Sequence, residues 1–124
     1  MLVSALLSPK GAPAQILAMT ISGQVTICYD SRILLEYKNV LLRDKFPFEP
    51  QGALALLNMI LLIGVAVLPK ASGTVFLDEA DKKFYETAKE SGAYLITGNM
   101  KHFPNDPNIV SPANFLLLST HLAE

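Results

Sequence analysis

The residues of this chain that could hydrolyse a phosphodiester bond are polar and lie in three separate segments. They are Glu36, then Asp78 and Asp81, then Asn99, Lys101 and His102. Carboxylates that converge on one point repel each other unless a divalent cation neutralises them, and hard oxygen ligands favour Mg²⁺ or Mn²⁺. A metal held in this way polarises a phosphodiester and activates a water molecule for attack. The acids therefore define a candidate metal site.

Each of these acids also has a purely structural interpretation. Asp78 and Asp81 are three positions apart at the expected start of a helix, so Asp78 can be its N-cap and Asp81 can favour its first turn. Glu36 borders the apolar stripe of another helix, where Arg32 or Lys38 could neutralise it. The metal site requires that the acids meet at one edge of a sheet.

The elements that must position these residues follow from periodicity and from turn signals. Helices are expected at 12–22, 31–43, 51–63, 78–91 and from 111 onward, and strands at 25–29, 65–68, 93–97 and 109–110. Because strands alternate with helices, we expect an α/β fold of three layers, with a parallel sheet flanked by helices. Ligands of such folds bind beyond the carboxyl ends of the strands.

Length and composition limit the remaining possibilities. The 124 residues fit a single domain, 1–124, and the net charge of −1 gives no overall attraction to nucleic acid. The single cysteine, Cys28, is typical of a buried thiol in a reducing cytoplasm. The uncharged run Gly52–Leu68 is expected to be a buried helix with Gly64 as its C-cap and then a strand, so no membrane segment is predicted.

Four segments carry a resemblance to a known family by their order and spacing. They are Leu2–Leu7 with the following Ser-Pro-Lys-Gly-Ala-Pro, then Leu35-Glu36-Tyr37, then Asp78-Glu79-Ala80-Asp81 with Phe84 and Ala88, and finally 95–99 with 101–104. The sequence resembles the PIN domain family, the metal-dependent ribonuclease fold found in the toxin components of many bacterial toxin–antitoxin systems. The resemblance extends from Met1 to the C-terminal helix.

This resemblance implies roles for the polar residues. Glu36 and Asp81 fall on two metal-binding acids of the family, with Mg²⁺ or Mn²⁺ as the cofactor, and Asp78 falls on an auxiliary acid. Asn99 stands where many relatives have a fourth aspartate, so it offers an amide oxygen but no negative charge.

The chain departs from the family at its start. Relatives open with a strand that ends in Asp-Thr-Asn, directly before the residues that match Met1–Ser4, and the aspartate of that strand is the central metal ligand. We hypothesise that an internal GTG valine codon was taken as the start of the reading frame, so that the strand is encoded upstream of it. We expect very low activity for a chain without this strand. The genomic DNA upstream would refute this if it encodes no such strand in frame.

The absent strand also has a consequence for assembly. The resemblance places it between the strands near Val25 and Leu95, where unpaired backbone groups would each cost roughly 1–3 kcal/mol. Either Leu2–Leu7 becomes extended, or the two neighbouring strands pair, or another copy fills the gap. We expect a homodimer or a larger assembly.

Two functions from different classes remain open. The first is a PIN-type endoribonuclease of a toxin–antitoxin pair, in which Lys101 and His102 contact RNA phosphate, although both could equally be ordinary surface residues. The second is a catalytically inactive domain that binds an antitoxin-like partner or itself. A phosphatase-like or receiver-like domain is a weaker third alternative.

Overall fold

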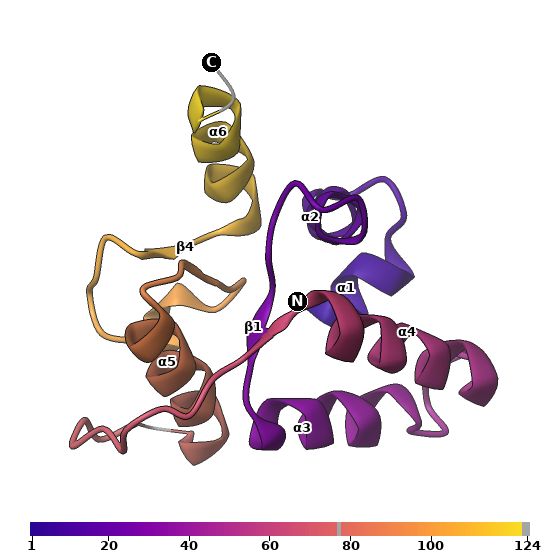
Figure 1. The fold of residues 1–124 in the computed structure, drawn as a ribbon, viewed down its shortest axis with the longest axis horizontal. Helices are drawn as coiled ribbons and strands as arrows, with labels where there is room; N and C mark the ends of the chain where they lie inside the picture. The colour runs from indigo at the N-terminus through magenta and orange to yellow at the C-terminus, as the bar shows by residue number, and fades with distance from the viewer. Residues whose placement is uncertain (77, 123–124) are drawn as a thin grey trace.

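The computed structural model describes residues 1–76 and 78–122 of the chain (Figure 1). It consists of helices and two-residue strands, with one or two helices between successive strands. The helices are α1 (Leu2–Leu7), α2 (Ala12–Ile21), α3 (Ser31–Leu41), α4 (Pro50–Ile63), α5 (Glu79–Ser91), the 3-10 helix η1 (Met100–His102) and α6 (Pro112–Leu122). The strands are β1 (Cys28–Tyr29), β2 (Val65–Ala66), β3 (Leu95–Ile96) and β4 (Ile109–Val110). The α/β class predicted from the sequence is confirmed.

All strand pairs are parallel, as expected for strands joined by helical connections. β1 pairs with β2 and β3 pairs with β4. The register aligns Cys28 with Val65, Tyr29 with Ala66, Leu95 with Ile109 and Ile96 with Val110. The described strands therefore form two separate two-stranded sheets.

β1 and β3 are the strands between which the family resemblance places an additional strand. Within residues 1–76 and 78–122 no strand lies between them, and they do not pair with each other. Leu2–Leu7, which could have filled this position as an extended segment, forms α1 instead. Two of the three ways in which we expected the chain to close the gap are therefore not used.

Three groups of buried side chains make up the core. Ile16, Val110 and Phe115 join α2, β4 and α6. Tyr29, Ile33 and Ile60 join β1, α3 and α4. Leu41, Ala53 and Leu57 pack the C-terminal end of α3 against the first half of α4. Leu116 and Leu118 pack against the first group, so α6 turns an apolar face to this part of the core.

The ends of the helices are fixed by local chemistry. Asp30 accepts a hydrogen bond from the Ile33 amide at 2.9 Å and so caps the start of α3. Gly92 ends α5 in the left-handed region with φ 68°. The prediction that Gly64 is the C-cap of α4 is confirmed, and its backbone there is extended, with φ −86° and ψ 175°. Gly64 is required by space, since a Cβ atom there would lie 2.8 Å from the Ile60 carbonyl oxygen.

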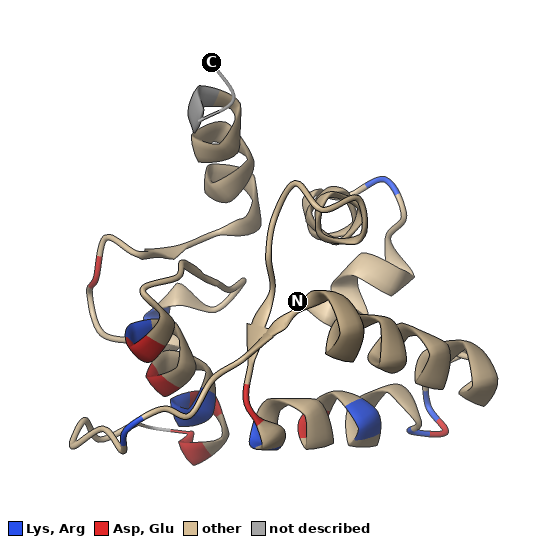
Figure 2. Ribbon diagram, viewed as in Figure 1, with Lys and Arg blue, Asp and Glu red and all other residues tan. Residues whose placement is uncertain are grey.

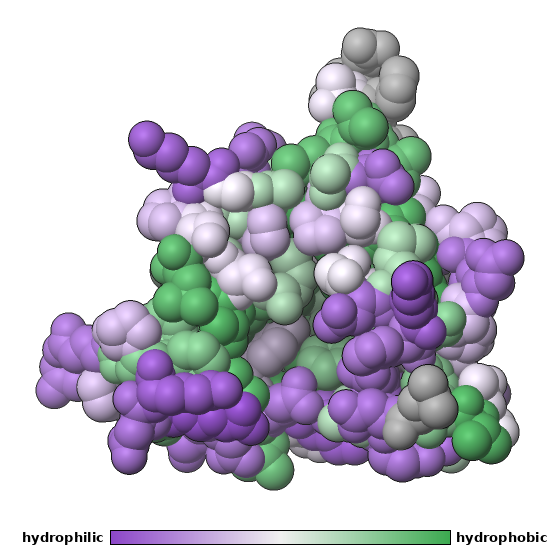
Figure 3. Space-filling model, turned by 180° about the vertical axis from the view of Figure 1, so that it is seen from behind, coloured by the Kyte–Doolittle hydropathy of each residue, from purple (hydrophilic) through white to green (hydrophobic). Residues whose placement is uncertain are grey.

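Charge is distributed unevenly over the elements. Lys, Arg, Asp and Glu side chains concentrate on α3, α5 and the loops, whereas α1, α2 and α4 carry none (Figure 2). From behind, strongly hydrophilic side chains follow the lower margin, and apolar and weakly polar ones fill much of the middle (Figure 3). Among the described helices none is long and apolar enough to cross a membrane, and α4 buries Leu57 and Ile60 as a core helix.

Candidate active site

Two ion pairs join α3 to α5 at successive turns. Arg32 binds Glu86 at 2.8 Å, and Glu36, one turn further along α3, binds Lys83 at 2.6 Å. The rings of Tyr37 and Phe84 add an aromatic contact between the same helices, with centroids 6.2 Å apart. This pairing brings the predicted acid of α3 next to the first turn of α5, which carries the other predicted acids.

Glu36 is a half-buried carboxylate whose partner comes from another helix. Its side chain is 32% exposed and that of Lys83 14%. The Lys83 ammonium also donates to the Ala80 carbonyl at 2.6 Å, so one cation links Glu36 to the residue directly before Asp81. The sequence interpretation with Arg32 or Lys38 as the partner of Glu36 is wrong, because neighbours on the same helix were considered and a residue of α5 was not.

The Glu36 carboxylate contributes to the shifted pKa values of two neighbouring groups. Burial, with a smaller contribution from Glu36, raises the pKa of the Tyr37 hydroxyl to about 12. Burial lowers the pKa of the Met1 ammonium, and the Glu36 carboxylate opposes this shift. The carboxylate therefore acts at the place where the start of α1 meets α3.

Asp78 and Asp81 occupy the start of α5 in different roles. The Asp78 carboxylate accepts a hydrogen bond from the Ala80 amide at 2.9 Å and caps the helix. Asp81, whose side chain is 24% exposed, lies 3.2 Å from Nδ1 of His102. The capping interpretation of Asp78 is confirmed, and Asp81 is directed toward the segment that follows β3.

The segment after β3 carries the remaining predicted residues. The Asn99 amide donates to the Thr97 hydroxyl at 3.0 Å, and the Asn99 carbonyl accepts from the His102 amide at 2.9 Å. This turn brings His102 to Asp81 and leaves the side chains of Asn99 and Lys101 exposed. The structure thus brings together Glu36 and Lys83, and Asp81 and His102, whereas Asn99 directly precedes η1 and Lys101 lies on it.

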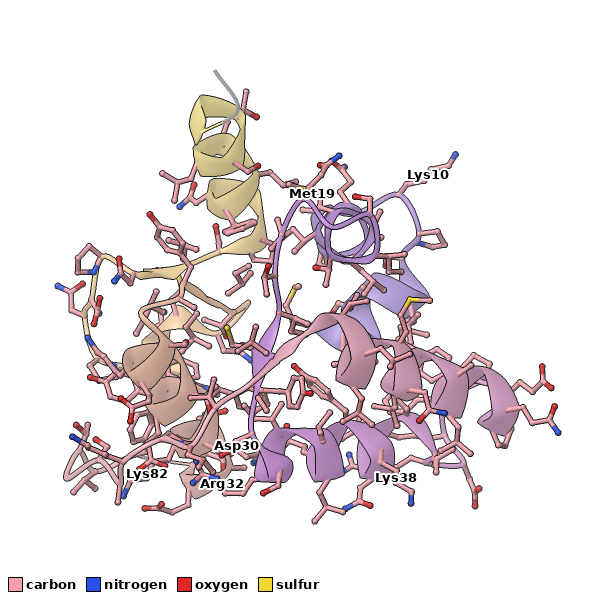
Figure 4. The ribbon with its side chains drawn as sticks, viewed as in Figure 1. Lys10, Met19, Asp30, Arg32, Lys38 and Lys82 are labelled. Atoms are coloured by element: carbon pink, nitrogen blue, oxygen red, sulfur yellow. The ribbon has the colours of Figure 1, made fainter. Side chains whose placement is uncertain are left out.

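An ionic network near these acids has no counterpart in the sequence-based prediction. Arg32 lies between Asp30 and Glu86 at the start of α3, with Lys82 nearby on α5 (Figure 4). Hydrogen bonds from Arg32 and from the Ser72 amide hold the pKa of Glu86 below its usual value, although burial opposes this. Arg32 and Glu86 are 54 positions apart, and no local pattern connects them.

A divalent cation held by side chains alone would require several oxygen or nitrogen ligands that lie close together. In residues 1–76 and 78–122 no three His, Cys, Asp or Glu side chains converge to form a ready-made metal site. However, Mg²⁺ usually keeps several water molecules and is held by one or two carboxylates together with substrate phosphates. Glu36 and Asp81 lie on the neighbouring helices α3 and α5, and carboxylates are the type of ligand that such a metal takes.

Comparison with known families decides which fold this arrangement belongs to. The model of the PIN domain matches residues 1–101. The chain belongs to the PIN domain family. Neither the search of curated proteins nor that of solved structures gave a match.

Membership gives this PIN domain a general function class. PIN domains are generally nucleases that depend on a divalent metal, and the matched range includes Glu36, Asp78, Asp81, Asn99 and Lys101. His102 and α6 lie beyond it. The assignment of individual metal ligands stays a prediction, supported by the neighbouring positions of α3 and α5.

Proposed function

We propose that this PIN domain is an endoribonuclease of the toxin type, which hydrolyses RNA with Mg²⁺ or Mn²⁺ in the cytoplasm. The observation that carries the proposal is the Glu36–Lys83 pair, which connects the α3 carboxylate to the first turn of α5, where Asp81 lies. Glu36 and Asp81 would hold the metal, and Asp78 and Asn99 would orient water at its edge. The metal would supply the charge that polarises the phosphodiester.

The residues of the chain prepare this site in the absence of metal. Lys83 neutralises Glu36 at 2.6 Å, so the carboxylate does not repel Asp81. His102, 3.2 Å from Asp81, connects the segment after β3 to α5. Lys101, exposed on η1, is placed to contact an RNA phosphate.

RNA cleavage tests this proposal directly. An end-labelled single-stranded RNA is incubated with the protein in Mg²⁺, in Mn²⁺ and in a chelator, and Asp81→Ala is the control. Cleavage that requires the cation and is lost in Asp81→Ala supports the proposal. The absence of cation-dependent cleavage in the wild type would reject it.

The alternative is an inactive PIN-like domain that binds an antitoxin-like protein or a second copy. The observation in its favour is that Glu36 already pairs with Lys83 and that Asp81 already lies 3.2 Å from His102, so side chains of the chain itself contact both carboxylates. In that case Asp81→Ala would leave partner binding unchanged and no RNA would be cleaved.

A further inference from the structure

Arg32 is held through its nitrogen atoms, while nearly half of its side chain is exposed. Its Nε and Nη2 atoms lie 2.6 Å from one oxygen of Asp30, and Nη1 lies 2.8 Å from Glu86. The side chains of Asp30 and Glu86 are only 7% and 4% exposed, but that of Arg32 is 47% exposed. Two carboxylates outweigh its single positive charge, so Arg32 is poorly suited to anchor a phosphate, yet nearly half of its side chain remains accessible.

The two carboxylates are themselves fixed by the backbone. The second oxygen of Asp30 accepts from the Ile33 amide at 2.9 Å, and the second oxygen of Glu86 accepts from the Ser72 amide. The network thus ties the start of α3, the middle of α5 and the loop after β2 to one guanidinium. Its plane is fixed before any ligand arrives, which reduces the entropy lost on binding.

The exposed part of the Arg32 side chain lines a hollow of about 670 Å³. The hollow lies beyond the carboxyl ends of β1 and β2, the position where α/β folds bind ligands. Its other walls include Leu34 and the apolar run 66–69, and Lys82 also lines it. Asp30 and Glu86 also line the hollow but are largely buried. A flat guanidinium, apolar walls and the Lys82 ammonium therefore suit a flat aromatic ring whose negative charge lies toward Lys82 and away from Arg32.

We propose that this hollow binds a nucleobase of single-stranded RNA, stacked on the guanidinium face of Arg32, with Lys82 facing the adjoining phosphate. Splayed bases of single-stranded RNA stack on arginine planes as well as on aromatic rings. The inference rests on the proposed function, since it concerns the substrate of the same site.

The position of the hollow relative to the acids explains what the contact would do. Arg32 and Glu36 lie one turn apart on α3, a rise of about 6 Å along the helix axis. Lys82, which lines the hollow, directly precedes Lys83, the partner of Glu36. A base seated on Arg32 would therefore hold the neighbouring backbone beside the acids, so Arg32 acts as a positioning and specificity residue.

Binding measured without divalent cations separates this contact from cleavage. The probes are a fluorescently labelled single-stranded RNA hexamer and an abasic ribose-phosphate hexamer, titrated with the full chain. Arg32→Lys keeps the charge and removes the plane. Leu68→Asp places a carboxylate on the wall without touching the network, and Lys38→Met removes a charge from the same helix outside the hollow.

The stacking contact predicts a base-dependent loss. Arg32→Lys and Leu68→Asp should weaken binding of the RNA hexamer roughly 5- to 150-fold. Arg32→Lys should leave binding of the abasic hexamer unchanged, and Lys38→Met should affect both probes equally. If both hollow variants bind the RNA hexamer with wild-type affinity, the inference is overturned. The same result is expected if the hollow binds a side chain of a protein partner instead of a base. If cation-dependent cleavage persists while the base effect is absent, only this inference fails; if the wild type neither binds nor cleaves RNA, the proposed function fails with it.

Discussion

Single side chains connect elements that are distant in the sequence of this PIN domain. Glu86 is buried at 5% exposure on α5, where it accepts hydrogen bonds from Arg32 and from the Ser72 amide. These donors stabilise its ionised form and therefore lower its pKa. The same carboxylate thus contributes to the stability of the fold and to the position of the Arg32 plane.

The pH dependence of stability follows from the lowered pKa of Glu86. Its contribution is fully present above the unfolded value of about 4.3 and is lost as the pH falls through the lower folded value. Glu86→Gln should reduce the unfolding free energy at pH 7 by about 1–3 kcal/mol and make it less sensitive to acid. Urea unfolding at pH 7 and pH 3 measures both effects. Glu90→Gln, exposed on the same helix, is the control, and an equal acid response of both variants would contradict the role of Glu86.

Lys83 and a divalent cation share one ligand, the carboxylate of Glu36. Lys83→Met should therefore strengthen Mn²⁺ binding about two- to fivefold, the range expected for removing a partly exposed ion pair. Calorimetric titration with Mn²⁺ measures this. The control is Lys89→Met, because Lys89 lies on the same helix as Lys83 but pairs with Asp106. Weaker binding by Lys83→Met would mean that the lysine holds Glu36 in place for the metal and does not compete with it.

At the scale of elements, the end of α4 is a close contact between a helix and a strand. A Cβ atom on Gly64 would lie 2.8 Å from both the Ile60 carbonyl oxygen and the Tyr29 ring. Gly64→Ala should therefore destabilise the fold by about 1–3 kcal/mol, as overpacking does. At Gly52, in the first turns of the same helix, a Cβ atom meets open space, so Gly52→Ala should stabilise by about 0.5–1 kcal/mol. Thermal unfolding compares the two, and equal effects would contradict the packing role of Gly64.

The extent to which the sequence predicted these elements depended on how local their causes are. Helices α2 to α6 and the cap at Asp30 were predictable because each arises from neighbouring residues, whereas α1 and η1 were not predicted. The Glu36–Lys83 pair was not predictable, because its members lie on different helices and many lysines could have reached the carboxylate.

The arrangement of the strands was predicted only in part. Parallel pairing follows from helical connections, and it is confirmed. The separation of the described strands into two sheets was not predicted, because periodicity does not tell which strands lie side by side.

At the scale of the whole molecule, apolar surface and unpaired strand edges suggest association. Leu62 on α4 is 86% exposed and Leu68 is 93% exposed. β1 and β3 each have a strand partner on one side only within the described residues. Open edges and apolar surface favour pairing with another chain. We predict a homodimer or a larger assembly in sedimentation velocity at micromolar concentration, and a monomer at all concentrations would contradict this.

The central claim is that Glu36 and Asp81 hold a divalent cation that cleaves RNA. The most direct measurement is the single-turnover rate of single-stranded RNA cleavage as a function of Mn²⁺ concentration. Asp81→Asn is compared with Glu79→Gln, which removes a charge from the same exposed first turn of α5. We predict that Glu79→Gln cleaves as the wild type does, whereas Asp81→Asn loses cleavage at every Mn²⁺ concentration. Equal rates for Asp81→Asn and the wild type, or cleavage that is independent of Mn²⁺, would contradict the claim.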